Sequence, residues 1–137
     1  MKLLIDVCSG MKFLHSLSVV HCDLAARNVL IQSAPCGNVA KVGDFGLASK
    51  WHYYGMVECS HPDFVAKVPL HWMSPECLDI LSFDFASDVW SFGVLLWEVF
   101  SFGAVPKLEN CRTSAQLCEA LKQDRRLTKP DFCPGNV

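Results

Sequence analysis

The sequence lacks the cysteine spacing of a zinc site or a paired redox motif. Eight of its 137 residues are cysteines, but none form a C-x-x-C pair and none group with histidines at zinc-ligand spacing. It also shows no secretory signal. We therefore expect reduced thiols and a cytoplasmic location, or the cytoplasmic side of a membrane if the parent protein is a receptor.

An excess of one charge sign is absent too. The formal net charge is -2, which excludes a general attraction to nucleic acid or to anionic membranes. No membrane-spanning run is present, because the most apolar stretch, Val89 to Phe102, is too short and contains four interruptions: Ser91, Gly93, Glu98 and Ser101. A hydrophobic fraction of 51% is high for a free-standing domain and suits a piece of a larger one.

Internal repeats, low-complexity tracts and linkers are missing, so the chain is expected to form one unit. Apolar residues at three- and four-residue spacing predict a first helix through about Ser16; they are Leu3, Leu4, Val7, Met11, Leu14 and Leu17. Two short β-rich runs, Val29–Ile31 and Val39–Val42, flank a turn-forming segment at 33–38 and predict a hairpin.

Two further helices are predicted, and no period holds from 43 to 71. Ser87 is the expected N-cap of a buried helix from Asp88 to Phe102, and Gly103 is expected to end it. A capping box at Thr113-x-x-Gln116 predicts a third helix with Leu117 and Leu121 on one face. The expected fold class is α+β, mostly α, with one small hairpin.

Polar residues flank the predicted hairpin. Asp23 and Asn28 precede its first strand and Asp44 follows its second, so a tight turn would return all three to one end. Such a group supplies oxygen ligands suited to Mg²⁺ and a carboxylate able to accept a proton. Each Asp alone is equally well explained as a turn or cap residue.

Four motifs in order then resemble those of protein kinases. "HCDLAARN" (His21 to Asn28) is similar to the catalytic loop, and "DFG" (Asp44, Phe45, Gly46) to the metal-binding turn. "SPE" (Ser74, Pro75, Glu76) resembles the end of the activation segment, and "SDVWSFGVLLWEVFSFG", which contains Asp88, the central helix of the large lobe. The resemblance covers residues 1–137 and implies a kinase-like C-terminal lobe.

Within that superfamily the loop resembles protein tyrosine kinases. Serine/threonine kinases usually carry Lys where this chain has Ala25, and tyrosine kinases place an Arg where it has Arg27. "VPLHWMSPE" (Val68 to Glu76) is similar to the stretch on which tyrosine kinases rest a substrate tyrosine. The segments "GMKFLHS" and "DRRLTKPDFCP" are most like growth-factor-receptor tyrosine kinases.

The resemblance implies ATP and Mg²⁺ as cofactors and tyrosine-bearing proteins as substrates. Asp23 would accept the tyrosine hydroxyl proton, Arg27 would position the phosphate, and Asn28 and Asp44 would hold Mg²⁺. Phe45 would pack under the metal-binding turn. It could equally be an ordinary aromatic residue of the core, and the two interpretations are compatible. Gly46 would permit unusual backbone dihedrals there. His21, Pro75, Glu76 and Asp88 are structural positions of the motifs; Asp88 would hold the backbone of the catalytic loop.

Several positions depart from the family pattern. Cys22 stands where an Arg usually docks the phosphorylated loop, so phosphorylation of Tyr53 or Tyr54 is expected to couple weakly to activity. The alternative is that the two tyrosines are exposed loop residues without a regulatory role. His71 replaces the usual Lys or Arg before Trp72; it is either a simple surface substitution or a pH-sensitive one. Ser74 stands where the family pattern has Ala, and this is a mild change.

A glycine-rich G-x-G-x-x-G loop and a V-A-I-K-type lysine are not found among the 137 residues. Residues 1–137 are therefore expected to be a partial kinase domain that lacks the small lobe and the last helices. In the family, those last helices carry the arginine that usually pairs with the glutamate at the position of Glu76. Two hypotheses stand: a fragment of a tyrosine kinase, inactive in isolation, or a truncated lobe that acts as a protein-docking module. Apolar surfaces left exposed would favour aggregation.

Overall fold

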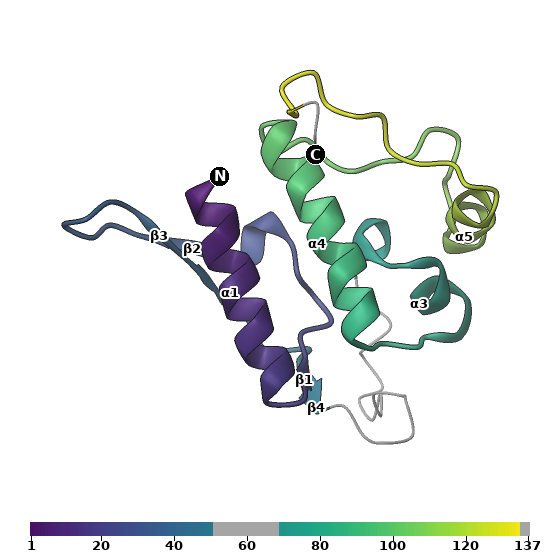
Figure 1. Ribbon diagram of the computed structural model, residues 1–137. Helices are drawn as coiled ribbons and strands as arrows, with labels where there is room; N and C mark the ends of the chain where they lie inside the picture. The colour runs from purple at the N-terminus through teal and green to yellow at the C-terminus, as the bar shows by residue number, and fades with distance from the viewer. Residues whose placement is uncertain (51–68, 135–137) are drawn as a thin grey trace.

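The computed structural model describes residues 1–50 and 69–134, and its elements are mainly helical (Figure 1). In chain order they are α1 (Lys2–Ser16), β1 (Val19–Val20), η1 (Ala26–Asn28), β2 (Val29–Gln32), β3 (Val39–Val42), β4 (Ser49–Lys50), η2 (Leu70–Trp72), α3 (Pro75–Ile80), α4 (Phe85–Phe100) and α5 (Ser114–Lys122). The elements labelled η are short 3₁₀ helices. An α+β, mostly α architecture is thus confirmed for the described residues.

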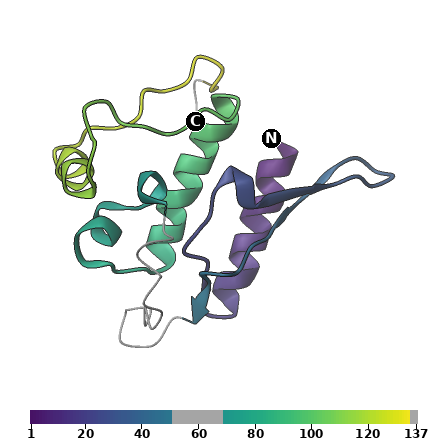
Figure 2. The same ribbon diagram turned by 180° about the vertical axis from the view of Figure 1, so that it is seen from behind.

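The first predicted helix and the hairpin both form. Helix α1 ends at Ser16 and buries Leu4, Val7 and Met11. Strands β2 and β3 pair antiparallel, with Val29 opposite Val42. Two polar contacts fasten the hairpin to α1: Lys2 donates to the carbonyl of Asn38 at 2.8 Å, and Asp6 accepts from the Ala40 amide at 3.2 Å. The far end of the hairpin stretches away from the helices in both views (Figure 2).

Helix α4 begins three residues earlier than predicted. Asp84, not Ser87, is the N-cap; its side chain accepts from the Ser87 amide, and the Ser87 hydroxyl accepts from the Asp84 amide in return. The expectation of Ser87 as N-cap was wrong because an Asp three residues upstream completes a reciprocal capping box. The helix is also not buried all round, since Val89 is 64% exposed.

A further helix, α3, was not predicted. It has only six residues, too few to show a period, yet its start carries two ordinary signals: Ser74 as N-cap, accepting from the Cys77 amide, and Pro75 in the first turn. Helix α5 has the predicted N-cap Thr113. The side chain of Gln116, however, accepts from Arg112 and not from Thr113, so the predicted box is only half formed.

The apolar core consists of two clusters that meet at the loop between β1 and β2. One contains Cys22 with Val20, Met73, Cys77 and Phe83; the other contains Leu24 with Leu4, Val7, Met11, Ala40 and Leu95. Because Cys22 and Leu24 anchor in different clusters, the intervening Asp23 is held from both sides.

Part of the segment predicted to be irregular, 43–71, is ordered too, since β4 pairs with β1.

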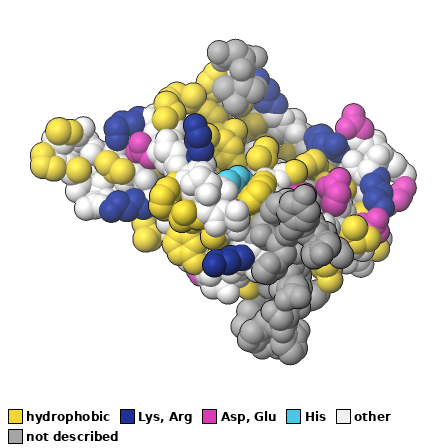
Figure 3. All heavy atoms as spheres, turned by 60° about the horizontal axis from the view of Figure 1, so that its bottom comes forward, with side chains coloured by type: hydrophobic (Ala, Val, Ile, Leu, Met, Phe, Trp, Pro, Cys, Tyr) yellow, Lys and Arg dark blue, Asp and Glu magenta, His cyan; other side chains and the backbone are white. Residues whose placement is uncertain are grey.

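Hydrophobic side chains also spread over the surface (Figure 3). Several of these residues are more than half exposed, including Ile5, Phe13, Leu30, Ile31, Phe102 and Phe132. Among the described residues, no helix has the length and apolar character needed to cross a bilayer.

Candidate active site

Asp23, Arg27 and Asn28 form one hydrogen-bonded group. Arg27 is ion-paired with Oδ1 of Asp23. The Asn28 amide nitrogen Nδ2 donates to Oδ2 of Asp23 at 2.9 Å and to the Asp23 carbonyl at 2.7 Å. The 3₁₀ turn Ala26–Asn28 makes this possible by folding the chain back within five residues. Both carboxylate oxygens of Asp23 are thereby oriented, and the carboxylate remains an acceptor for a hydroxyl proton.

The open end of the hairpin, opposite its turn at 33–38, brings Asp44 toward this group. The Gly43 amide donates to the Asn28 carbonyl at 2.8 Å, directly beyond the Val29–Val42 pair. Asp44 takes the left-handed conformation, with φ of 58°, and its Oδ1 accepts from the Gly46 amide at 3.2 Å. Asp suits this turn because its side chain can accept from the backbone two residues later and because it tolerates the left-handed conformation.

The expected role of Gly46 was therefore wrong. Its φ is not positive; the left-handed residue of the turn is Asp44. A different constraint favours glycine at 46, because a Cβ there would lie 3.2 Å from Oδ1 of Asp44. A side chain would crowd the carboxylate that closes the turn.

His21 lies fully buried beneath the loop and links it to the hairpin. Its Nδ1 accepts from the Asp23 amide at 3.3 Å, so its Nε2 carries the proton and donates to the Gly43 carbonyl at 3.1 Å. The ring of Phe45 lies 5.5 Å from the His21 ring, centroid to centroid. Phe45 is 51% exposed, so the expectation of an ordinary core aromatic was wrong. Its contact with the His21 ring leaves packing at the metal turn as a prediction.

Asp88 holds the backbone just before Asp23, as expected from its place in the motif. It is 2% exposed and accepts from the amides of His21 at 2.9 Å and Cys22 at 3.0 Å. Cys22 is left-handed, with φ of 65°, a conformation that non-glycine residues adopt rarely and that the two hydrogen bonds help to maintain. Its side chain is buried in the first core cluster.

Glu98 is a site residue that the sequence reasoning missed. Its Oε2 accepts from the Ala26 amide at 2.9 Å and from the indole Nε1 of Trp72 at 2.8 Å, and the side chain is buried. The guanidinium of Arg27 lies 4.9 Å from the centre of the Trp72 ring. Glu98 thus joins the loop of Asp23 to η2. The available signal was a lone carboxylate in the apolar run of α4, where a buried charge requires partners.

The donor set fits Mg²⁺. Since Nδ2 of Asn28 faces Asp23, its Oδ1 is the atom available to a cation, and Asp44 adds an exposed carboxylate. Mg²⁺ is commonly held by one or two such protein oxygens together with substrate phosphates. The described residues contain no group of three or more His, Cys, Asp or Glu side chains that could hold a metal.

The other predicted positions lie apart from this group. Pro75 begins α3, and Glu76 is exposed and makes no ion pair with any described residue. Tyr53 and Tyr54 fall outside the described residues. His71 is half-buried and its Nδ1, enclosed, has no hydrogen-bond partner in the described part of the chain. Burial, and secondarily the charge of Lys107, lower the pKa of His71.

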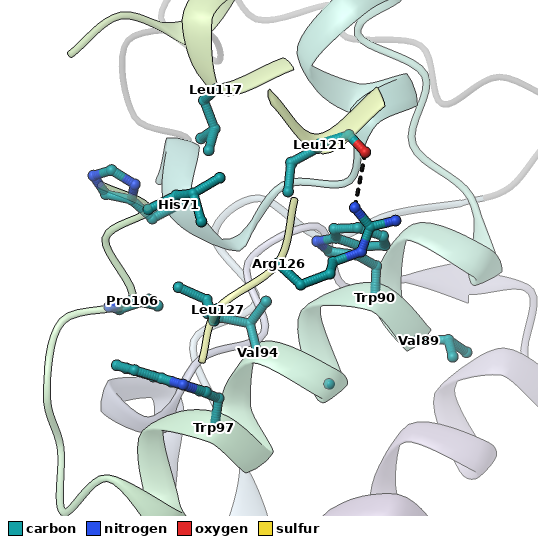
Figure 4. A pocket seen from close by; sticks show the side chains of 12 residues that line it. His71, Val89, Trp90, Val94, Trp97, Pro106, Leu117, Leu121, Arg126 and Leu127 are labelled. Atoms are coloured by element: carbon teal, nitrogen blue, oxygen red, sulfur yellow. Dashed lines mark hydrogen bonds between the residues drawn. The ribbon is translucent and has the colours of Figure 1, made fainter. Parts of the chain in front are cut away.

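An apolar cavity of about 330 Å³ lies between α4 and α5 (Figure 4). His71, Trp90, Trp97, Leu117 and Arg126 are among its lining residues, whereas Asp23, Asn28 and Asp44 are not. The Arg126 guanidinium stacks 5.2 Å from the Trp90 ring centre and donates to the Leu121 carbonyl at 2.8 Å. This cavity is separate from the carboxylate and amide group.

A carboxylate, an amide and a basic side chain at a hairpin end, with an Asp turn beside them, are the kinds of groups that a phosphoryl-transfer site uses. The comparisons agree: residues 1–137 match the family model of the protein tyrosine and serine/threonine kinases. The chain belongs to this family.

Its relatives include named tyrosine kinases. The chain is 43% identical to the tyrosine-protein kinase csk-1 of Caenorhabditis elegans, in an alignment that covers 100% of the chain and 24% of csk-1. It is 42% identical to vascular endothelial growth factor receptor 2 of Mus musculus over 93% of the chain and 9% of the receptor. With ephrin type-B receptor 4b of Danio rerio the identity is 39%, over 96% of the chain and 13% of that receptor. The chain spans a quarter or less of these relatives.

Proposed function

We propose that this chain carries the catalytic loop and metal-binding turn of a protein tyrosine kinase, which transfers the γ-phosphoryl group of ATP to tyrosine in signalling proteins. The observation that carries the proposal is the Asp23–Arg27–Asn28 group at the end of the hairpin that leads to Asp44. Mg²⁺, when bound, neutralises charge on the phosphate oxygens. Asp23 orients and accepts the hydroxyl proton, and Asn28 and Asp44 direct oxygens toward the cation.

Tyrosine, in preference to serine or threonine, is supported by the surroundings of Arg27. Its guanidinium is held between the Asp23 carboxylate and the Trp72 ring, and Ala25 is fully buried where a lysine would need solvent. The ring of Trp72 is itself fixed through Glu98. This rigid platform suits a long substrate side chain such as tyrosine, and the relative csk-1 is by name a tyrosine-protein kinase.

Residues 1–137 are proposed to be part of a kinase domain, the C-terminal lobe, in a cytoplasmic protein or on the cytoplasmic side of a receptor. The exposed side chains of Leu30 and Ile31 on β2 support this, because in a complete domain such surfaces would be covered. Tyr53 and Tyr54 remain proposed phosphorylation sites. Their coupling to activity is proposed to be weak, since Cys22, buried in an apolar cluster, offers no cation.

A second candidate function is a protein-docking module that no longer transfers phosphate. It is favoured by one observation: exposed apolar side chains, such as Ile5 and Phe13 on the outer side of α1, form a surface that a partner protein could cover. The two candidates differ in whether the described site binds nucleotide.

Calorimetry with ATP and Mg²⁺ on the 137-residue chain tests the choice. The matched variants are Asp44→Asn, which removes the proposed ligand charge, and Asp79→Asn, which alters an exposed carboxylate that is paired with Lys122. Binding lost in the first variant and kept in the second supports a nucleotide site in this chain. No binding by a chain with a cooperative melt would favour the docking module and assign any kinase activity to a longer protein.

Transfer is then measured with a peptide that contains one tyrosine and with its phenylalanine counterpart. The kinase proposal expects phosphate on the tyrosine peptide alone, and expects Asp23→Asn to abolish the transfer because the proton acceptor is lost. Transfer that survives Asp23→Asn would contradict the role given to Asp23.

A further inference from the structure

The buried carboxylate of Asp88 has a third hydrogen-bond donor besides the two amides of the loop. Nε2 of His15, in the last turn of α1, lies 2.9 Å from Oδ2 of Asp88. The same Oδ2 accepts from the His21 amide, and Oδ1 accepts from the Cys22 amide. The Asp88 side chain is 1% exposed and that of His15 23% exposed, so water contributes little to this contact.

The orientation of the His15 ring follows from the chemistry of its partner. A carboxylate only accepts hydrogen bonds, so Nε2 of His15 carries a proton and donates it. The ring is packed as well, since its centroid lies 4.6 Å from that of Phe85. Its place at the C-terminal end of α1 is where a helix favours a donor or a positive charge.

We propose that His15 is a positioning residue that acts through Asp88 on the backbone of the catalytic loop. Without the His15 donor, Oδ2 of Asp88 would keep one hydrogen bond, the one from the His21 amide. Rotation of the carboxylate about the Cβ–Cγ bond, which has only a shallow energy profile, would then be less restricted. The amides of His21 and Cys22 depend on that carboxylate, and Cys22 is the left-handed residue directly before Asp23. Only the catalytic consequence of this positioning rests on the proposed function.

Two substitutions of His15 separate the donor from the bulk of the side chain. In His15→Gln the amide nitrogen is as many bonds from Cα as Nε2 of histidine, so it reaches Asp88. In His15→Asn the amide nitrogen is one bond shorter and does not. His15→Leu, which keeps volume but has no donor, is the third variant, and Phe13→Leu at an exposed position of the same turn is the control.

The measurement is amide hydrogen exchange at His21 and Cys22 in the 137-residue chain without nucleotide. We expect exchange at both to be about tenfold faster in His15→Asn and His15→Leu, and unchanged in His15→Gln and the control. The Leu121 amide in α5, another element, should not respond. Equal rates at His21 and Cys22 in the Gln and Asn variants would overturn the proposal, as would an equal acceleration at Leu121.

Because this readout needs no phosphoryl transfer, it separates the two proposals. A chain that shows the expected exchange pattern but fails the nucleotide and transfer tests retains His15 as a positioning residue and loses the proposed kinase activity. A chain that transfers phosphate with equal exchange in both variants retains the activity and loses the role of His15.

Discussion

At the scale of single residues, α4 buries polar side chains where its sequence would suggest apolar packing. Asp88 and Glu98 are 2% and 7% exposed, and both use their oxygens to accept from the loop that carries Asp23. Buried carboxylates are tolerated only where donors surround them. The loop therefore owes its shape to two acceptors on one helix as well as to its own turn.

Replacing Glu98 tests this dependence. Glu98→Leu leaves the Ala26 amide and the Trp72 indole without their acceptor, and we expect the free energy of unfolding to fall by about 3 kcal/mol. Glu98→Gln keeps one acceptor oxygen and should lose about 1 kcal/mol. Urea unfolding followed by Trp fluorescence and circular dichroism measures both. Equal losses in the two variants would show that the hydrogen bonds are not what Glu98 contributes.

His71 should make stability depend on pH. Its pKa is lowered in the fold by burial and by Lys107, so the folded chain binds fewer protons than the unfolded chain below the ordinary value of 6.5. Stability is therefore complete above that value and is lost as the pH falls through it toward the folded pKa.

The measurement compares urea midpoints at about pH 8 and about pH 5.5 for the parent chain and His71→Gln. We expect the parent to lose more stability on acidification than the variant, which has no titrating group there. A variant with the same pH dependence as the parent would exclude His71 as the cause, since the other histidines are present in both chains.

At the scale of elements, the caps decide where the helices begin. Asp84 accepts from the Ser87 amide at 2.8 Å and Thr113 from the Gln116 amide at 3.2 Å. We expect Asp84→Ala to lower the free energy of unfolding by about 1 kcal/mol, since an N-cap acceptor is removed.

Thermal unfolding by circular dichroism measures this change, with Asp131→Ala, a loop carboxylate outside the helices, as the control. Asp84→Asn should retain nearly all of the stability, because asparagine is an equally good cap. A loss in Asp84→Asn as large as in Asp84→Ala would indicate that the carboxylate charge, and not the cap, is responsible.

Local patterns predicted those elements whose signals are complete within a few residues. The period of α1 and the turn before Val39 predicted one helix and the hairpin correctly. The start of α4 was misplaced because two cap residues three positions apart form one box, and each alone is a credible N-cap. The pairing of β1 with β4 could not be predicted, since strands of two residues have no periodicity.

The site residues, too, were predictable only where the signal is local in the sequence. Asp23, Asn28 and Asp44 were found because they flank a local hairpin. Glu98 and His15 act over 72 and 73 residues of sequence separation, on Ala26 and Asp88. A lone carboxylate in an apolar run marks Glu98 as a residue that needs partners, but no local pattern says which residues those partners are. Only the packing of α4 beside α1 and the loop brings them together.

At the scale of the whole molecule, the described residues combine an ordered site with an unusually apolar surface. Two positions on the outer side of α1, Ile5 and Phe13, are 62% and 63% exposed. Soluble proteins rarely leave large apolar areas facing water unless another surface covers them. The isolated 137-residue chain should therefore associate with itself, in agreement with the aggregation expected from its sequence.

The double variant Ile5→Gln, Phe13→Gln should weaken this association without altering the fold, because exposed substitutions change stability by only about 0.5 kcal/mol. Sedimentation velocity over a range of concentrations measures association, and a thermal melt measures stability. The matched control, Ile5→Leu with Phe13→Leu, keeps the apolar area and should associate like the parent. If the glutamine variant associates as strongly as the leucine variant, the exposed face of α1 is not the surface responsible, and the apolar residues at Phe102 and Phe132 become the next to test.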